Sequence, residues 1–110
     1  MPDIMLTDVD SDAFVKEVLE PPVPVVVEFF SPVCRFCRRF DPIIEALTEK
    51  YAESVKFCRV NATENLRLAM EYNVFSVPTT FVFRGGRVSW RVNGFVPAEE
   101  LAPQIESVLR

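Results

Sequence analysis

Residues 25–42 have the sequence VVVEFFSPVCRFCRRFDP, in which a strand-forming run meets a helix-forming run at a pair of cysteines. The run VVVEFF is β-branched and aromatic on both alternating faces, which is typical of a strand buried in the middle of a sheet. From Cys34 onward, apolar residues recur every three or four positions, which is the spacing of an amphipathic helix. The cysteines are therefore predicted at a strand-to-helix junction, where open α/β sheets gather their reactive groups.

Outward from this stretch, the chain alternates between strand and helix patterns. Strands are predicted at residues 4–7, 23–30, 55–63, 79–86 and 87–94, and helices at 10–20, 34–53, 64–73 and 96–110. Gly85 and Gly86 separate two β-rich runs and indicate a hairpin. The order β-α-β-α-β-α-β-β-α predicts an α/β fold, with a central mixed sheet of four to five strands and helices on both faces.

A few residues predict where the helices begin, bend or end. Asp10 or Ser11 is expected to cap the first helix. Pro42 should kink the second helix, because proline donates no backbone hydrogen bond and its ring crowds the preceding turn. Pro103 should kink or restart the last helix for the same reason. Asn73 suits the left-handed residue that follows a helix.

Size and composition limit the classes of function. The chain has 110 residues, 49% hydrophobic and 25% charged, which predicts a single globular domain over residues 1–110. A net charge of −4 argues against a nucleic-acid or anionic-membrane partner. The sequence has no histidine, so Cys–His and Ser–His catalytic pairs are excluded. No signal-peptide pattern or membrane-spanning run is found, and we expect a cytoplasmic monomer without a cofactor.

The cysteine pair is suited to thiol–disulfide chemistry. Residues three apart on the first turn of a helix share a face, at a separation that fits a disulfide. The unpaired N–H groups of a helix N-terminus stabilise a thiolate, and Arg35, Arg38 and Arg39 add positive charge within two turns. A stabilised thiolate favours the reduced form and makes the disulfide more oxidising. Phe36 offers an apolar surface beside the reactive sulfur.

Other interpretations of the same residues are open. The cysteines could be incidental or half of a metal site, and the arginines could form a solvated helix face. A metal carrier is the weakest of these alternatives, because two thiolates without a further ligand nearby make a poor zinc site.

Several segments resemble the thioredoxin family, and the resemblance extends from about Phe14 to Leu109. VVVEFFSPVCRFCRRFDP resembles the family's strand, redox motif and kinked helix. VPTTFVFRGG resembles the segment that carries the family's cis-proline, here Pro78. VNGF places Gly94 at a substrate-groove glycine, and FCRVNAT places Arg59 where the family usually has lysine.

The resemblance implies a thioredoxin fold and an oxidoreductase that exchanges its dithiol with protein disulfides. Cys34 would attack the substrate to form a mixed disulfide, and Cys37 would resolve it. Pro78 would lie across from Cys34, and the backbone of Val77 would pair with an extended substrate segment. A thioredoxin-reductase-like enzyme or another donor would supply electrons.

Glu28 is aligned with a buried aspartate of the family. A carboxylate in a central strand is costly unless it is paired or protonated. Glu28 is therefore expected to accept the proton of the Cys37 thiol, with Arg59 as a neighbouring charge, or else to form a structural pair with Arg59 or reach the surface. The sequence leaves these possibilities open.

The chain departs from the family at the groove. The usual Gly-Pro between the cysteines is Arg35-Phe36, and the usual tryptophan before the motif is Val33. The family's partners therefore do not transfer, and a thioredoxin-fold binding module with a redox-sensitive latch is the alternative function. The third cysteine, Cys58, lies in a predicted strand and is expected to be buried and inert.

Overall fold

The computed structural model describes residues 6–109, and its elements follow the predicted order. The strands are β1 (Leu6–Asp8), β2 (Val25–Phe30), β3 (Lys56–Asn61), β4 (Thr79–Arg84) and β5 (Arg87–Asn93). The helices are η1 (Val15–Leu19), α1 (Arg35–Tyr51), α2 (Leu66–Glu71) and α3 (Ala98–Val108). Residues 4 and 5, the first half of the first predicted strand, lie outside the described residues.

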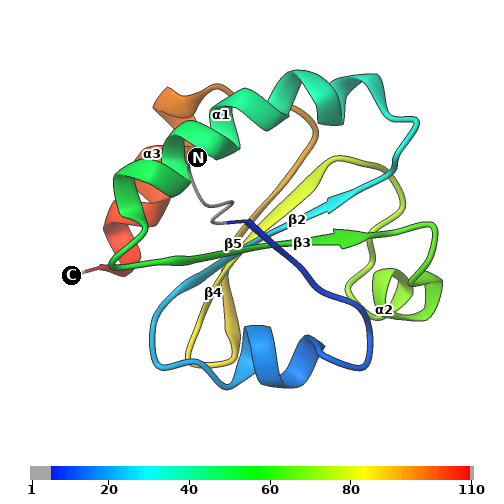
Figure 1. Cartoon of the computed structure of the whole chain (residues 1–110), viewed down its shortest axis with the longest axis horizontal. Helices are drawn as coiled ribbons and strands as arrows, with labels where there is room; N and C mark the ends of the chain where they lie inside the picture. The colour runs from blue at the N-terminus through cyan, green and yellow to red at the C-terminus, as the bar shows by residue number, and fades with distance from the viewer. Residues whose placement is uncertain (1–5, 110) are drawn as a thin grey trace.

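The five strands form one mixed sheet in the order β1-β3-β2-β4-β5 (Figure 1). β1, β3 and β2 are parallel, whereas β4 is antiparallel to β2 and β5 is antiparallel to β4. β2 occupies the middle of the sheet, as its apolar sequence predicts. Gly85 and Gly86, which join β4 to β5, have φ angles of 59° and 78°, a conformation that favours glycine. The predicted hairpin is therefore confirmed.

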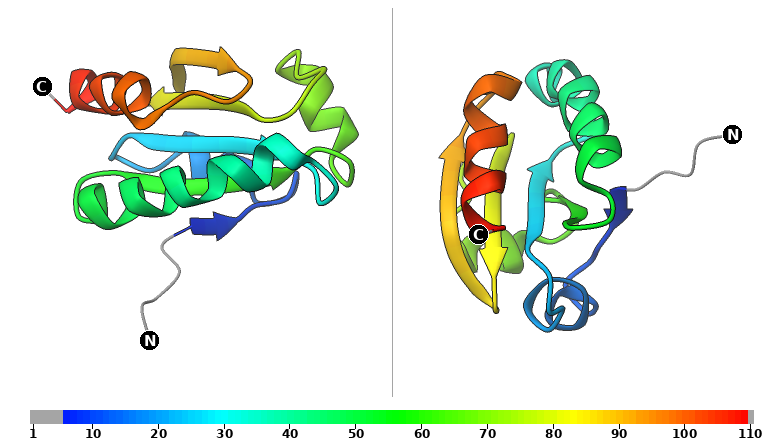
Figure 2. Two further views of the ribbon diagram at one scale, coloured as in Figure 1. Left: turned by 90° about the horizontal axis from the view of Figure 1, so that it is seen from above. Right: turned by 90° about the vertical axis from the view of Figure 1, so that its left-hand side faces the viewer.

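Helices cover both faces of the sheet. Figure 2 shows α1 and α3 on one face, and η1 and α2 on the other. The side chains of β2 alternate between these two layers: Val26 packs with α1 and α3, whereas Val25 and Val27 pack with η1 and α2. Each layer has its own apolar core, and the strand residues Phe29, Phe57, Phe81 and Phe83 are all buried in it. The predicted α/β architecture is confirmed.

The first helix is shorter than the sequence predicts. η1 has π-type geometry over Val15–Leu19, and the N–H of Glu20 donates to the carbonyl of Val15 at 3.0 Å. Residues 11–13 form turns before η1, and the carboxylate of Asp10 accepts a hydrogen bond from the N–H of Ala13 at 2.9 Å. The N-cap of η1 is Phe14, so the predicted cap at Asp10 or Ser11 lies too early in the chain. The prediction of a helix over residues 10–20 is therefore wrong at its N-terminal half.

Both long helices continue through their prolines. Pro42 lies inside α1 and Pro103 lies inside α3, so the predicted alternative of a restart at Pro103 is wrong. Pro103 is exposed, while Leu101 and Ile105 on either side of it are fully buried and hold α3 against the sheet. Asn73, just beyond α2, has a φ of 56°, as predicted.

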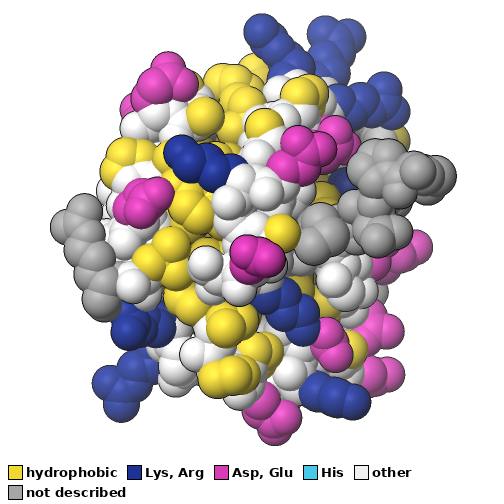
Figure 3. All heavy atoms as spheres, turned by 60° about the vertical axis from the view of Figure 1, so that its left-hand side comes forward, with side chains coloured by type: hydrophobic (Ala, Val, Ile, Leu, Met, Phe, Trp, Pro, Cys, Tyr) yellow, Lys and Arg dark blue, Asp and Glu magenta, His cyan; other side chains and the backbone are white. Residues whose placement is uncertain are grey.

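The described surface carries charges of both signs. Acidic and basic side chains are interspersed with apolar ones over most of the face shown in Figure 3. Within residues 6–109, none of the helices combines the length and the apolar character that a bilayer crossing needs.

Candidate active site

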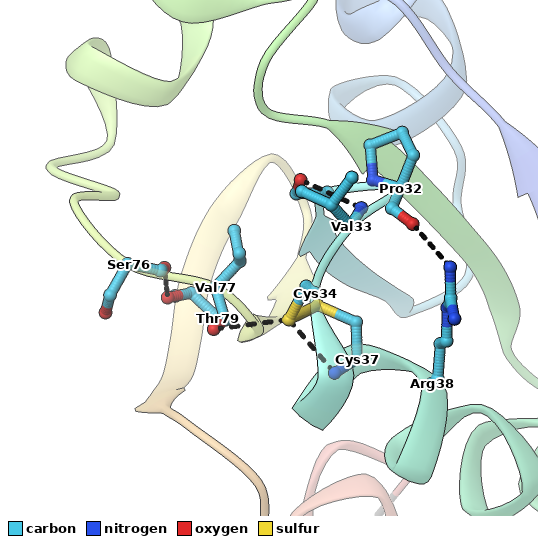
Figure 4. The surroundings of a disulfide bond; sticks show 9 residues. Pro32, Val33, Cys34, Cys37, Arg38, Ser76, Val77 and Thr79 are labelled. Carbon is cyan, nitrogen blue, oxygen red and sulfur yellow. Dashed lines mark hydrogen bonds between the residues drawn. A yellow bond between two sulfur atoms is a disulfide. The ribbon is translucent and has the colours of Figure 1, made fainter.

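Cys34 and Cys37 form a disulfide at the junction between β2 and α1 (Figure 4). Their Cα atoms are 5.2 Å apart, within the usual range for a disulfide. The N–H of Cys34 donates to the carbonyl of Ser31 at 3.1 Å, which closes the short loop that leads from β2 into the helix. Cys34 is partly exposed, whereas Cys37 is only 2% exposed. Cys34 is therefore the more accessible of the two cysteines.

Cys34 is also the N-cap residue of α1. Its backbone is extended, with φ −87° and ψ 116°, and its Sγ atom accepts a hydrogen bond from the N–H of Cys37 at 3.1 Å. An N–H of the first helical turn that points at a sulfur stabilises negative charge there. The geometry therefore favours the thiolate form of Cys34 once the pair is reduced.

The segment before β4 borders the exposed sulfur. The carbonyl oxygen of Val77 lies 3.6 Å from the Sγ atom of Cys34, and the Val77–Pro78 peptide bond is cis. The carbonyl of Pro78 accepts a hydrogen bond from the N–H of Gly94 at 2.7 Å. The structure thus joins three of the predicted groove residues, Val77, Pro78 and Gly94, in one corner beside Cys34.

The three arginines near the cysteines have different environments. Nη2 of Arg38 donates to the carbonyl of Pro32 at 3.2 Å, so its side chain folds back over the loop before Cys34 (Figure 4). Arg35 and Arg39 are exposed on α1. All three lie within the first five residues of the helix, so their charges add to the field of its N-terminus.

Exposed apolar side chains surround the junction. Val33 and Phe36, predicted for the groove, are 85% and 57% exposed. Sequence reasoning missed Leu66 and Phe75, which are 63% and 81% exposed. Both line a cavity of about 200 Å³ that adjoins Val77. The signal that could have found them is an apolar side chain on the outward face of α2 and another in the connection just before Val77.

Glu28 is buried in the middle of the sheet. It is 1% exposed, and neither of its carboxylate oxygens has a hydrogen-bond partner within residues 6–109. It lies two residues after Val26 and therefore faces the layer that contains α1. Burial, helped by the charge of Asp41 and opposed by that of Arg59, raises the pKa of Glu28 from 4.5 to about 7. A carboxyl with this pKa can take up or release a proton near neutral pH.

Arg59 does not pair with Glu28, although the two are Cα partners between β2 and β3. Its Nε atom lies 3.7 Å from Oδ1 of Asp8, and its guanidinium lies 3.7 Å from the centroid of the Phe30 ring. The side chain borders a surface cavity of about 440 Å³, where water can solvate its charge. The two structural alternatives for Glu28, an ion pair with Arg59 and a surface position, are therefore wrong.

Cys58 is separate from the redox pair. It is fully buried in β3 as a free cysteine, and burial raises the pKa of its thiol to about 11. The predicted burial of Cys58 is confirmed, and its raised pKa agrees with the prediction that the thiol is inert. Over the described residues, no three metal-ligating side chains come together, so a metal carrier gains no support.

Comparison with known proteins agrees with this geometry. The family model described as Thioredoxin matches residues 5–107. Thioredoxin 1 of a Nostoc species is 36% identical over 92% of this chain and 94% of its own length. Thioredoxin of a Synechocystis species is 38% identical over 90% and 94%, respectively. Thioredoxin M4, chloroplastic, of Arabidopsis thaliana is 41% identical over 84% of this chain and 48% of its own length. With the Cys34–Cys37 pair at the head of α1, the chain belongs to the thioredoxin family and is a protein-disulfide oxidoreductase.

Proposed function

We propose that Cys34 is the attacking thiolate and Cys37 the resolving thiol in the exchange with protein disulfides. The observation that carries this assignment is the unequal exposure of the two cysteines, with Cys34 partly exposed and Cys37 2% exposed. The hydrogen bond from the Cys37 N–H to the Cys34 sulfur supports it, because this bond favours the thiolate at the accessible position. In the resolving step Cys37 has to attack only the sulfur of Cys34, to which its own sulfur is bonded in the structure.

The exchange in the reducing direction has two steps. The Cys34 thiolate forms a bond with one substrate sulfur, and the other substrate sulfur leaves with the electron pair of the broken S–S bond. Cys37 then gives up its proton and attacks Cys34, and the first substrate sulfur leaves as a thiolate. The substrate disulfide gains two electrons and two protons, and the Cys34–Cys37 pair is oxidised to the disulfide found in the structure.

Glu28 is the proposed acceptor of the Cys37 proton. It lies beneath α1, the helix that carries Cys37, and no hydrogen bond within residues 6–109 occupies its oxygens. Its pKa of about 7 leaves part of the population ionised at neutral pH and makes that carboxylate a stronger base than an exposed one.

The proposed substrate groove follows the corner beside Cys34. An extended substrate segment pairs with the backbone at Val77, next to Pro78 and Gly94, in the manner of an added strand. Apolar substrate side chains contact the exposed apolar residues around the junction, and Arg35 attracts acidic ones. The apolar contacts are Val33, Phe36, Leu66 and Phe75, the last two at the rim of the cavity of about 200 Å³.

Substitution of each cysteine tests the assignment. Cys34→Ser should abolish the reduction of insulin, and Cys37→Ser should accumulate a mixed disulfide with the substrate at Cys34. Cys58→Ser is the matched control and should keep full activity, since Cys58 is buried away from the pair. If Cys34→Ser protein still reduced insulin, or if Cys37→Ser protein trapped no substrate, the assignment would be wrong.

We also propose a single domain that acts as a monomer and receives electrons from a thioredoxin-reductase-like enzyme or another donor. The family model spans residues 5–107, which supports the single domain. The cytoplasmic location expected from the sequence stays a prediction. The binding-module alternative is not favoured, because the curated relatives are thioredoxins and Cys34 and Cys37 lie at disulfide distance.

A further inference from the structure

A row of polar side chains crosses the apolar layer beneath α1. Arg59 of β3, Glu28 of β2 and Thr80 of β4 are Cα partners in successive strands of the sheet. Both oxygens of Glu28, the Nε of Arg59 and the Oγ1 of Thr80 are buried without a hydrogen-bond partner within residues 6–109. Burying polar atoms without hydrogen-bond partners lowers the stability of a folded protein. A cluster of such atoms at one place therefore indicates a functional role.

Asp41 brings a second carboxylate to this layer. It lies in α1 four residues after Cys37 and three before Ile44, and both of these are buried. Helical spacing therefore places Asp41 on the inward stripe of α1. Its Oδ1 atom is buried and has no hydrogen-bond partner among the described residues, while the residue as a whole is partly exposed. Asp41 thus extends from the buried layer to the surface.

The charges around Glu28 come from two elements. Asp41 of α1 disfavours the ionised form of Glu28, and Arg59 of β3 favours it. Thr80 of β4 is uncharged, Cys37 of α1 is in the disulfide, and the inward side chains of α3 are apolar: Leu101, Ile105 and Val108. The negative charge of Asp41 therefore opposes the ionisation of the buried Glu28 carboxyl.

We propose that Asp41 and Glu28 form a pair of inward-facing carboxylates beneath α1, and that Asp41 is a positioning residue for Cys37 chemistry. Its negative charge makes Glu28 a stronger base toward the Cys37 thiol. Its partial exposure gives the pair a contact with solvent, which Glu28 lacks at 1% exposure. The inference rests on the proposed function of Glu28 as proton acceptor.

The proton balance is simple. When Cys37 attacks Cys34, the thiol proton moves to the carboxylate pair, the Cys34–Cys37 bond forms, and the bond from Cys34 to the substrate breaks. The substrate leaves as a thiolate. The pair then releases the proton through Asp41 to solvent, where the departing thiolate is protonated.

The test measures the rate at which Cys37 resolves a mixed disulfide between Cys34 and a small thiol, as a function of pH. Asp41→Asn keeps the shape of the side chain and removes its charge. We expect the pH midpoint of the resolution rate to fall by about half a unit or more, and the rate above the midpoint to fall several-fold, because Glu28 becomes a weaker base. Asp41→Glu should restore the wild-type profile.

Glu45→Gln is the matched control, since it removes one negative charge from the exposed face of the same helix and should leave the profile unchanged. Glu28→Gln should remove the pH step, and Asp41→Asn should add nothing in that background. An unchanged Asp41→Asn profile, or the same shift in the presence and absence of Glu28, would overturn the inference. A pH step that survives Glu28→Gln would instead show that the proposed acceptor is wrong, and the inference would fall with it.

A titration of the wild-type protein provides a second readout that needs no variant at Asp41. Carbon-13 NMR of labelled glutamate should show Glu28 titrating well above the ordinary range of a glutamate, because burial and the charge of Asp41 disfavour its ionised form. A single step at the ordinary pKa of glutamate would contradict the carboxylate pair.

Discussion

The backbone N–H of Cys37 donates a hydrogen bond to the sulfur of Cys34 at 3.1 Å, so the buried cysteine supports charge on the exposed one. This support comes from the main chain and does not depend on the Cys37 thiol. Cys37→Ala should therefore keep the pKa of reduced Cys34 below that of an ordinary thiol. Cys37→Pro removes the donor at a position in the first helical turn where proline is tolerated, and should raise the pKa by about one unit. The thiolate absorbance at 240 nm as a function of pH measures both values, and equal pKa values in the two variants would contradict the prediction.

The arginines should have a smaller effect than the backbone N–H. Arg38→Ala removes one positive charge near the pair, and solvent screens much of its field. We expect the pKa of Cys34 to rise by about 0.3 units and the reduction potential to fall by roughly 10 mV, because the thiolate is less stabilised. Arg67→Ala, on the exposed side of α2, is the control with the same charge change. Equilibration in glutathione buffers should show a shift for Arg38→Ala only.

Glu28 should make the folded protein less stable as the pH rises. In the folded protein it keeps its proton up to about pH 7, whereas the unfolded chain releases it near 4.5. Folding therefore binds a proton between these pH values, and the free energy of unfolding falls as pH rises through this window, by on the order of 3 kcal/mol. Glu28→Gln should remove this contribution and be more stable than the wild type at pH 8. Urea denaturation at pH 4.5 and pH 8 measures the difference, with Glu45→Gln expected to retain the wild-type slope.

The two hairpin glycines should differ in their tolerance of a side chain. Both have positive φ, but a Cβ at Gly86 would lie 3.1 Å from the carbonyl oxygen of Leu19, whereas a Cβ at Gly85 would meet nothing within 4 Å. Gly85→Asn should cost less than about 1 kcal/mol, because asparagine tolerates the left-handed conformation. Gly86→Asn should cost about 1–3 kcal/mol, because η1 is packed against the sheet and its carbonyl cannot retreat freely. Thermal unfolding of the two variants provides the comparison, and equal midpoints would refute it.

The apolar rim should affect substrate binding more than chemistry. Phe75→Ser and Leu66→Ser place a small polar residue beside the cavity next to Val77. Because both side chains are largely exposed, the fold should be unaffected, while the KM for insulin should rise about three- to tenfold with little change in kcat. Val88→Ser, an exposed apolar position on β5, is the control and should leave KM unchanged. A fall in kcat alone would place these residues in the chemical step and not in the groove.

The sequence patterns that predicted the fold correctly reflect conformational preferences set by residues close together in the chain. The apolar run of β2, the glycine pair of the hairpin and the left-handed Asn73 each depend on backbone or side-chain preferences that neighbours do not override. The prediction of the first helix was wrong at its start, because residues 11–13 form turns before η1 and apolar periodicity does not distinguish a turn from the first turn of a helix. The helix restart failed because buried neighbours hold α3 together across Pro103.

The candidate site was predictable only where its residues are contiguous in sequence. The orientation of the Arg59 side chain depends on Asp8 in another strand and on the ring of Phe30. The segment FCRVNAT alone therefore could not predict which residues Arg59 contacts. Asp41 could not be predicted as a site residue, because a carboxylate on the inward face of a helix interrupts the apolar pattern from which that face is predicted. Its charge acts on Glu28 only in the folded protein, in which α1 covers the face of the sheet that carries Glu28.

The buried position of Cys58 provides a practical reporter. In the oxidised protein Cys34 and Cys37 have no free thiol, so Cys58 is the single thiol that a chromogenic disulfide reagent could modify. The folded molecule should give no colour, and each molecule that opens globally should give one equivalent. The rate of labelling under native conditions therefore counts opening events directly, without an engineered probe or an added fluorophore.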